Sequence, residues 1–111
     1  MINWKEIKDK YQKAFKEFSK WGNHVAVLSR QKQRLLYDFF DENEIYIEIE
    51  IDRTLEAKFA PSVYWLEEEM EDLDFDCYQN WTDECLYKTR REAEEAAFIK
   101  AFEILENKLR S

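Results

Sequence analysis

Hydrophobic residues recur at helical spacing near the start of the chain. Their spacing alternates between three and four residues, so they form one apolar seam, which Phe15 widens. The residues of the seam are Trp4, Ile7, Tyr11, Ala14, Phe18 and Trp21. This period predicts one amphipathic helix over residues 4–21. Asn3 is a suitable N-cap, and Gly22-Asn23 is a suitable stop. The lysines of this stretch fall off the seam, so the helix should present a basic outer side.

The pattern over residues 24–43 predicts a second helix. Its apolar side consists of Leu35, Leu36, Phe39 and Phe40. Ser29 is a suitable cap for the main part of this helix, and Asn43 supplies a turn residue after it.

Strict alternation begins at Ile45. Isoleucines at every second position through Ile51 alternate with Tyr46, Glu48, Glu50 and Asp52, which predicts a strand with one apolar face and one acidic face. Arg53-Thr54 can form a tight turn. Leu55, Ala57 and Phe59 then predict a partner strand that ends near Pro61, because proline cannot donate to a sheet ladder. Residues 63–66 would extend it after a bend.

The remaining pattern is acidic first and helical last. Residues 67–76 contain seven acids in ten and predict a loop or short helix. Leu73, Phe75 and Cys77 alternate as in a third strand, and residues 85–87 allow a fourth. Thr89-x-x-Glu92 is a capping box for a helix reaching about Leu109. The expected core side of this helix is Phe98, Ala101, Phe102, Leu105 and Leu109.

These elements predict an α+β fold. Two N-terminal helices precede a three- to four-stranded, mainly antiparallel sheet, and a C-terminal helix packs on one face of it. A length of 111 residues fits a single domain over residues 1–111.

Composition supports a folded protein in a reducing compartment. Apolar residues make up 45% of the chain, with one Gly and one Pro. Cys77 and Cys85 fit no metal or redox motif, so they are expected as reduced thiols, or as a bridge if their Cα atoms come within about 7 Å. No signal peptide or membrane span is visible. The expected location is therefore the cytoplasm, with no membrane partner.

Charge is segregated along the chain, whose net charge is −8. Residues 1–34 carry a net +6, residues 35–88 a net −14, and residues 89–111 none. The acidic middle repels nucleic acid and anionic membranes and suits a protein partner with a basic surface.

The sequence carries little catalytic chemistry. His24 is the one histidine, and no nucleophile motif or glycine-rich phosphate loop accompanies it. Glu48 and Glu50 lie roughly 7 Å apart by strand rise, but a solvated sheet face explains them as well. We therefore expect a protein that is not an enzyme and uses no cofactor.

A divalent-metal function is an alternative at residues 72–76. Asp72, Asp74 and Asp76 begin like a calcium loop, and Asp83 stands at its twelfth position. Cys77 occupies the sixth position, where the sharp turn needs Gly.

The acidic band is the leading candidate for a binding surface. Carboxylates on alternate strand residues repeat about every 6.6–7 Å, close to the spacing of successive phosphates, so the band could imitate a nucleic acid. The alternative is simple solubility and blunted sheet edges. The candidate residues are Glu48, Glu50, Asp52, Glu67, Glu68, Glu69, Glu71, Asp72, Asp74 and Asp76.

A nucleic-acid-binding module is the second alternative. Its basic residues would be Lys8, Lys13, Lys16, Lys20, Arg30 and Arg34. The sequence pI of about 4.8 opposes it.

Two stretches carry a resemblance. They are Tyr37-Asp38-Phe39-Phe40-Asp41-Glu42 leading into Ile45-Tyr46-Ile47, and residues 89–98 with 101–106. Both resemble uncharacterised small proteins of phages and prophages of gut Bacteroidetes. The resemblance implies a phage-encoded accessory protein. The resulting hypothesis is a non-enzymatic binder of a basic macromolecule, in its sharpest form an inhibitor of a host defence or nucleic-acid-handling protein. A homodimer is compatible with it.

Overall fold

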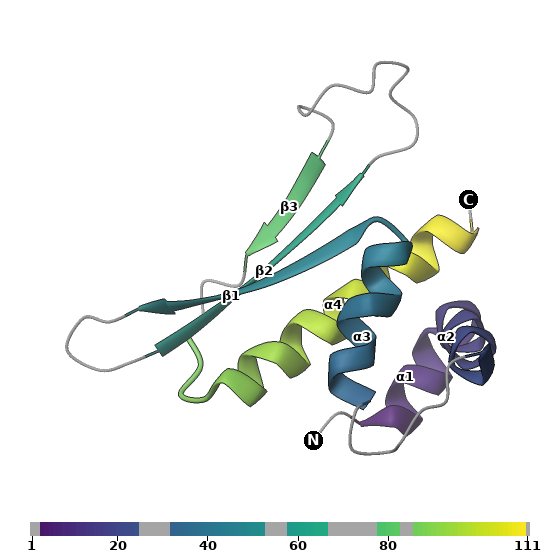
Figure 1. Cartoon of the computed structure of the whole chain (residues 1–111), viewed down its shortest axis with the longest axis horizontal. Coiled ribbons are helices and arrows are strands. Elements are labelled where there is room, and N and C mark those ends of the chain that lie inside the picture. The colour runs from purple at the N-terminus through teal and green to yellow at the C-terminus, as the bar shows by residue number, and fades with distance from the viewer. Residues whose placement is uncertain (1–2, 25–31, 53–57, 67–77, 83–85, 111) are drawn as a thin grey trace.

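The computed structural model describes residues 3–24, 32–52, 58–66, 78–82 and 86–110 of the chain. Within them it has helices and an antiparallel sheet, with the C-terminal helix packed on the sheet, so the predicted α+β class is confirmed (Figure 1). The elements in chain order are α1 (Trp4–Lys10), α2 (Gln12–His24), α3 (Lys32–Glu42), β1 (Ile45–Asp52), β2 (Lys58–Leu66), β3 (Tyr78–Thr82) and α4 (Arg90–Arg110).

The three strands lie in the order β1-β2-β3, and both neighbouring pairs are antiparallel. Helices α3 and α4 pack on one face of this sheet. That core face carries the odd-numbered residues of β1, beginning with the fully buried Ile45, and Val63 of β2. The opposite face, here called the outer face, carries the even-numbered residues of β1. The alternation predicted for residues 45–52 is therefore confirmed.

The core is built mainly from aromatic rings. Phe102 of α4 meets Phe40 edge-to-face at 5.0 Å between centroids, and it also contacts Trp4 and Phe18. Ala93, Ala97 and Ala101 of α4 are fully buried. Their small side chains let the α4 backbone approach the sheet closely, because a larger side chain there would need space that a close-packed core does not leave.

The first predicted helix is in fact two. The chain leaves helical geometry at Tyr11, where φ is −124° and ψ is 59°, between α1 and α2. We call this break the elbow. Asn3 caps α1 as predicted, since its Oδ1 accepts from the Glu6 amide at 3.2 Å. The predicted stop at residues 22–23 was early, since α2 continues to His24.

A buried carboxylate explains the elbow. Glu106 of α4 is 3% exposed and accepts hydrogen bonds from the amides of Ala14 at 2.8 Å and Lys13 at 3.3 Å. These amides open α2, where the first turn of a helix has no acceptor of its own. A side chain that inserts into the helical ladder in this way breaks the helix. Trp21 fastens the other end of α2 to α3 by donating its indole N–H to Glu42.

The described part of the second predicted helix is α3, Lys32–Glu42, and residues 25–31 of the predicted range lie outside the described residues. Ser29 lies outside the described residues. Leu36, Phe39 and Phe40 are buried as predicted. Asn43 lies in the turn after α3, as predicted, and donates its side-chain amide to the Phe39 carbonyl at 2.8 Å. The left-handed residue of this turn is Glu44, with φ 60°.

The second strand includes residues 63–66 as predicted, but the prediction that it is interrupted near Pro61 was wrong. β2 runs through Pro61, which pairs with Ile49. Phe59 exchanges both backbone hydrogen bonds with Tyr87, at 2.8 and 2.9 Å. Backbone groups two residues apart in an antiparallel strand point the same way, so the Pro61 nitrogen also points away from β1. The β1–β2 ladder therefore loses no donor at this proline.

The C-terminal half holds further differences. The described third strand is Tyr78–Thr82, later in the chain than the predicted alternation at residues 73–77, which lies outside the described residues. In place of a fourth strand at residues 85–87, the described part shows one bridge between Tyr87 and Phe59. Thr89 caps α4 as predicted, accepting from the Glu92 amide at 3.1 Å. Leu109, predicted in the core, is 37% exposed, because it lies one turn beyond the last buried residues of α4.

Candidate interaction surface

Two of the predicted partner-binding residues can be placed in full. Glu48 and Glu50 are exposed on the outer face of β1. Asp52 belongs to the same strand, but its side chain is outside the described part, as are the remaining predicted acids: Glu67, Glu68, Glu69, Glu71, Asp72, Asp74 and Asp76. The described candidate surface is therefore the pair Glu48 and Glu50, here called the edge glutamates.

Small residues flank the edge glutamates on β2. Ser62 lies directly opposite Glu48, and Ala60 lies opposite Glu50. Neither side chain reaches over a neighbouring glutamate. Farther across the outer face, Thr82 and Asn80 of β3 are exposed and uncharged. The side chains directly opposite the carboxylates are therefore short, while Tyr64 and Lys58 occupy the diagonal positions on β2.

The position of β1 at the end of the sheet leaves one strand edge open among the described residues. The backbone N–H and C=O of Phe59 point toward Tyr87 and therefore away from β1. Phe59 and its β1 partner Ile51 thus form a non-hydrogen-bonded pair. The same alternation applies to Ile49 and Ile47. The amide and carbonyl groups of these isoleucines thus point away from β2, toward the open edge. The amide and carbonyl groups of Glu48 and Glu50 point the other way and pair with β2.

The opposite, helical side of the molecule carries a set of exposed basic residues on α1, α2 and α3. Lys8, Lys13, Lys16 and Lys20 are all exposed, as is Arg34 of α3, while Arg30 lies outside the described residues. Lys20 is 3.8 Å from Glu17 in an exposed ion pair, which contributes little to stability. The structure thus brings together part of the second predicted set, on α1 and α2.

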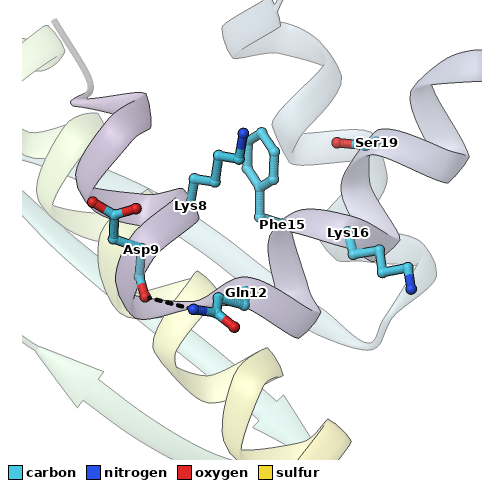
Figure 2. A pocket seen from close by; sticks show the side chains of 6 residues that line it. All are labelled: Lys8, Asp9, Gln12, Phe15, Lys16 and Ser19. Atoms are coloured by element: carbon cyan, nitrogen blue, oxygen red, sulfur yellow. Dashed lines mark hydrogen bonds between the residues drawn. The ribbon is translucent and has the colours of Figure 1, made fainter.

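An open groove of about 360 Å³ crosses the elbow between α1 and α2. Its lining residues are Lys8, Asp9, Gln12, Phe15, Lys16 and Ser19. In Figure 2 Phe15 lies between Lys8 and Lys16, and Gln12 donates to the Asp9 carbonyl at 3.4 Å. Phe15 is half-buried and contacts Trp4 edge-on at 6.3 Å between centroids. The groove therefore combines two cations with part of an aromatic ring.

The polar groups inside the molecule serve the fold. Burial raises the pKa of Glu106, but the amides of Ala14 and Lys13 and the Arg110 guanidinium outweigh this, so its pKa lies below the ordinary value. Burial, followed by the nearby negative charge of Glu94, raises the pKa of Tyr37 to about 12. At neutral pH the Glu106 carboxylate is therefore ionised and the Tyr37 hydroxyl is neutral, and neither has a pKa suited to proton transfer near pH 7.

The other candidate chemistry falls largely outside the described residues. This applies to Cys77, Cys85 and the acids of the calcium-like segment, while His24 ends α2 with its side chain outside the described part. Among the residues that the structure describes, no group of three His, Cys, Asp or Glu side chains is placed to hold a metal ion. In the same part, no helix is long and apolar enough to cross a membrane.

No family model, curated protein or solved structure matches the chain. Any inference about function therefore depends on the fold and the surfaces described above.

Sequence reasoning missed three features of these surfaces. The elbow groove depends on a helix break that the continuous seam hides. The burial of Glu106 could have been predicted from the sequence, because Glu106 follows Phe102 by four residues and so lies on the core side of α4. The open edge of β1 depends on strand order, which the alternation of a single strand does not specify.

Proposed function

We propose that this protein is a non-enzymatic binding protein that holds a basic macromolecular partner on the outer face of its sheet. The observation that carries the proposal is the pair of exposed edge glutamates on a face with no described helix against it. The β2 residues directly opposite them, Ser62 and Ala60, are small, so a lysine or arginine can approach each carboxylate and form a charge-assisted hydrogen bond.

The segregation of charge supports this choice of face. Helix α2 packs against α4, on the helical side, so the lysines of α1 and α2 lie away from the outer face. A basic partner that docks on the outer face is therefore attracted by the edge glutamates without meeting those lysines. Such complementarity accelerates association and makes it sensitive to salt.

The proposal extends to the acidic run and to a biological setting. Seven acids in residues 67–76 would add to the attraction for the same partner. The resemblance to small phage proteins suggests an accessory protein made during infection. A host defence or nucleic-acid-handling protein fits as the partner, because such proteins carry basic grooves that an acidic surface can occupy.

The test is affinity capture from a bacterial lysate at low and high salt, read by mass spectrometry. The double variant Glu48→Lys with Glu50→Lys should lose a protein that wild type enriches at low salt. The matched control is Asp38→Lys with Glu92→Lys, which changes net charge equally at exposed helical positions. Equal loss in both variants would point to net charge alone, and no loss in either would exclude the outer face.

The elbow groove supports a second candidate, the binding of single-stranded nucleic acid. Lysines beside an aromatic ring can contact phosphates while the ring stacks on a base. Labelled single-stranded DNA and RNA should then shift in mobility at low salt. The shift should disappear in Lys8→Glu with Lys16→Glu and persist in the edge-glutamate variant.

A further inference from the structure

The open edge of β1 presents outward-pointing backbone groups in addition to the charge of the edge glutamates. The backbone amides and carbonyls of Ile47, Ile49 and Ile51 point outward from the sheet, and none of them has a hydrogen-bond partner among the described residues. An unpaired strand edge of this kind is a template for pairing with another extended chain. β1 is eight residues long, which is long for an edge strand that a protein leaves open.

The side chains of β1 add a two-sided pattern to that edge. On the core face, Ile47 and Ile49 are half-buried and Ile51 is 45% exposed. Their burial decreases along the strand from the fully buried Ile45. On the outer face stand Glu48 and Glu50. The edge thus presents apolar surface on one face and negative charge on the other, in register with its free backbone groups.

We infer that the edge of β1 binds an extended segment of a partner protein in which lysine or arginine alternates with apolar residues, and that this segment adds to the sheet as a further strand. The inference rests on the proposed function and specifies the partner's form. Apolar side chains of the segment would cover the isoleucines, while its cations would face the edge glutamates.

The geometry of strand pairing favours this occupant. In antiparallel addition, residues opposite the isoleucines would exchange hydrogen bonds with them, and residues opposite Glu48 and Glu50 would form the non-hydrogen-bonded pairs. Side chains in such pairs approach most closely, with Cα atoms about 4.5 Å apart. Opposite charges there stabilise the pairing.

The same geometry disfavours a second copy of this chain on the edge. Antiparallel pairing of two β1 strands with Glu48 near Glu50 of the other copy would bring like charges together on one face, which destabilises the pair. Charge therefore selects a basic strand over self-association. A purely protective role, in which the glutamates only keep other strands away, predicts instead that no peptide adds to this edge.

The test uses two eight-residue peptides with blocked ends, one alternating Lys and Val and one with four Lys followed by four Val. Backbone amide hydrogen exchange of the whole protein is followed by NMR at low salt. With the alternating peptide at ten times its Kd, exchange of the Ile47 and Ile49 amides should slow about tenfold. The Glu48 and Glu50 amides, already bonded to β2, serve as internal references.

The outcomes separate the inference from the proposed function. Protection by the alternating peptide, absent with the block peptide and in Glu48→Lys with Glu50→Lys, supports strand addition. Chemical-shift changes near the glutamates without protection of Ile47 and Ile49 overturn it and leave an acidic docking face in place. Absence of binding by either peptide also overturns it, while lysate capture still decides the proposed function. Circular dichroism confirms that the variant is folded.

Discussion

Removal of the Glu106 carboxylate should destabilise the fold more than any other single loss of charge among the described residues. Glu106 is 3% exposed and joins α4 to the start of α2 across the core. In Glu106→Ala the amides of Ala14 and Lys13 lose their acceptor. In Glu106→Gln one oxygen remains, but the new NH₂ group faces an amide donor.

The structure sets the size of the effect. The 2.8 Å bond to the buried Ala14 amide is a charge-assisted bond worth about 1.5–3 kcal/mol. The longer, part-buried bond to Lys13 adds about 1 kcal/mol. The ion pair with Arg110, a side chain 61% exposed, adds about 0.5 kcal/mol or less. Glu106→Ala should thus cost about 3–4 kcal/mol and Glu106→Gln about 2 kcal/mol.

Urea unfolding followed by tryptophan fluorescence measures this cost. With a slope of about 1–3 kcal/mol per molar, a loss of 3 kcal/mol lowers the midpoint by about 1–3 M. Glu103→Gln is the matched control, because Glu103 lies one turn earlier on α4 in a part-buried pair with Lys100 and is much more exposed than Glu106. Its midpoint should stay close to that of wild type. Equal midpoints for Glu106→Gln and Glu103→Gln would refute the role of Glu106 as a cap on the first turn of α2.

The cap also predicts a pH dependence. The pKa of Glu106 is lowered in the folded protein below its ordinary value of 4.5, so the unfolded chain takes up this proton first as pH falls. The stabilisation is therefore complete above 4.5 and is lost as pH falls through the folded pKa. The stability difference between wild type and Glu106→Gln should be constant near neutral pH and shrink in acid. A difference that stays unchanged in acid would contradict an ionised cap.

Three further predictions concern other parts of the fold. Ala97→Leu should lower the free energy of unfolding in urea by about 1–3 kcal/mol, because Ala97 is fully buried where α4 packs on the sheet. Ala96 is half-buried, so Ala96→Leu should cost clearly less. Equal costs would contradict the close packing. Tyr37→Phe should be nearly neutral at pH 7, since its hydroxyl is buried without a hydrogen-bond partner among the described residues. Because the pKa of Tyr37 is raised to about 12 from 10.0, wild type should lose stability between those pH values more steeply than Tyr37→Phe; parallel curves would refute this. Thr89→Ala should cost about 1 kcal/mol by removing the α4 cap, and Thr89→Ser should restore it.

The fold class and several element boundaries were predictable because local patterns set them. The alternation from Ile45 to Asp52 matches β1 residue for residue, and the Thr89 cap marks the start of α4. These signals depend on neighbours in sequence, where side-chain period and capping chemistry act directly.

The features that sequence missed are set by contacts distant in the chain. A single seam runs through α1 and α2, yet Glu106, more than ninety residues after Ala14, breaks the helix at Tyr11. Pro61 stays inside β2 because Phe59 turns its backbone to Tyr87, a pairing that the local pattern does not encode. The candidate surface was predictable as a strip of acids on one strand face. Its open edge was not, because strand order follows from tertiary packing.

The proposed function is tested most directly by one comparative capture. Wild type, Glu48→Lys with Glu50→Lys, and Lys8→Glu with Lys16→Glu are used as baits in the same lysate at low salt. The outer-face account predicts a protein partner that is retained by wild type and the lysine variant and lost from the glutamate variant. Retention by the glutamate variant, with loss from the lysine variant, would contradict it and assign binding to the elbow groove.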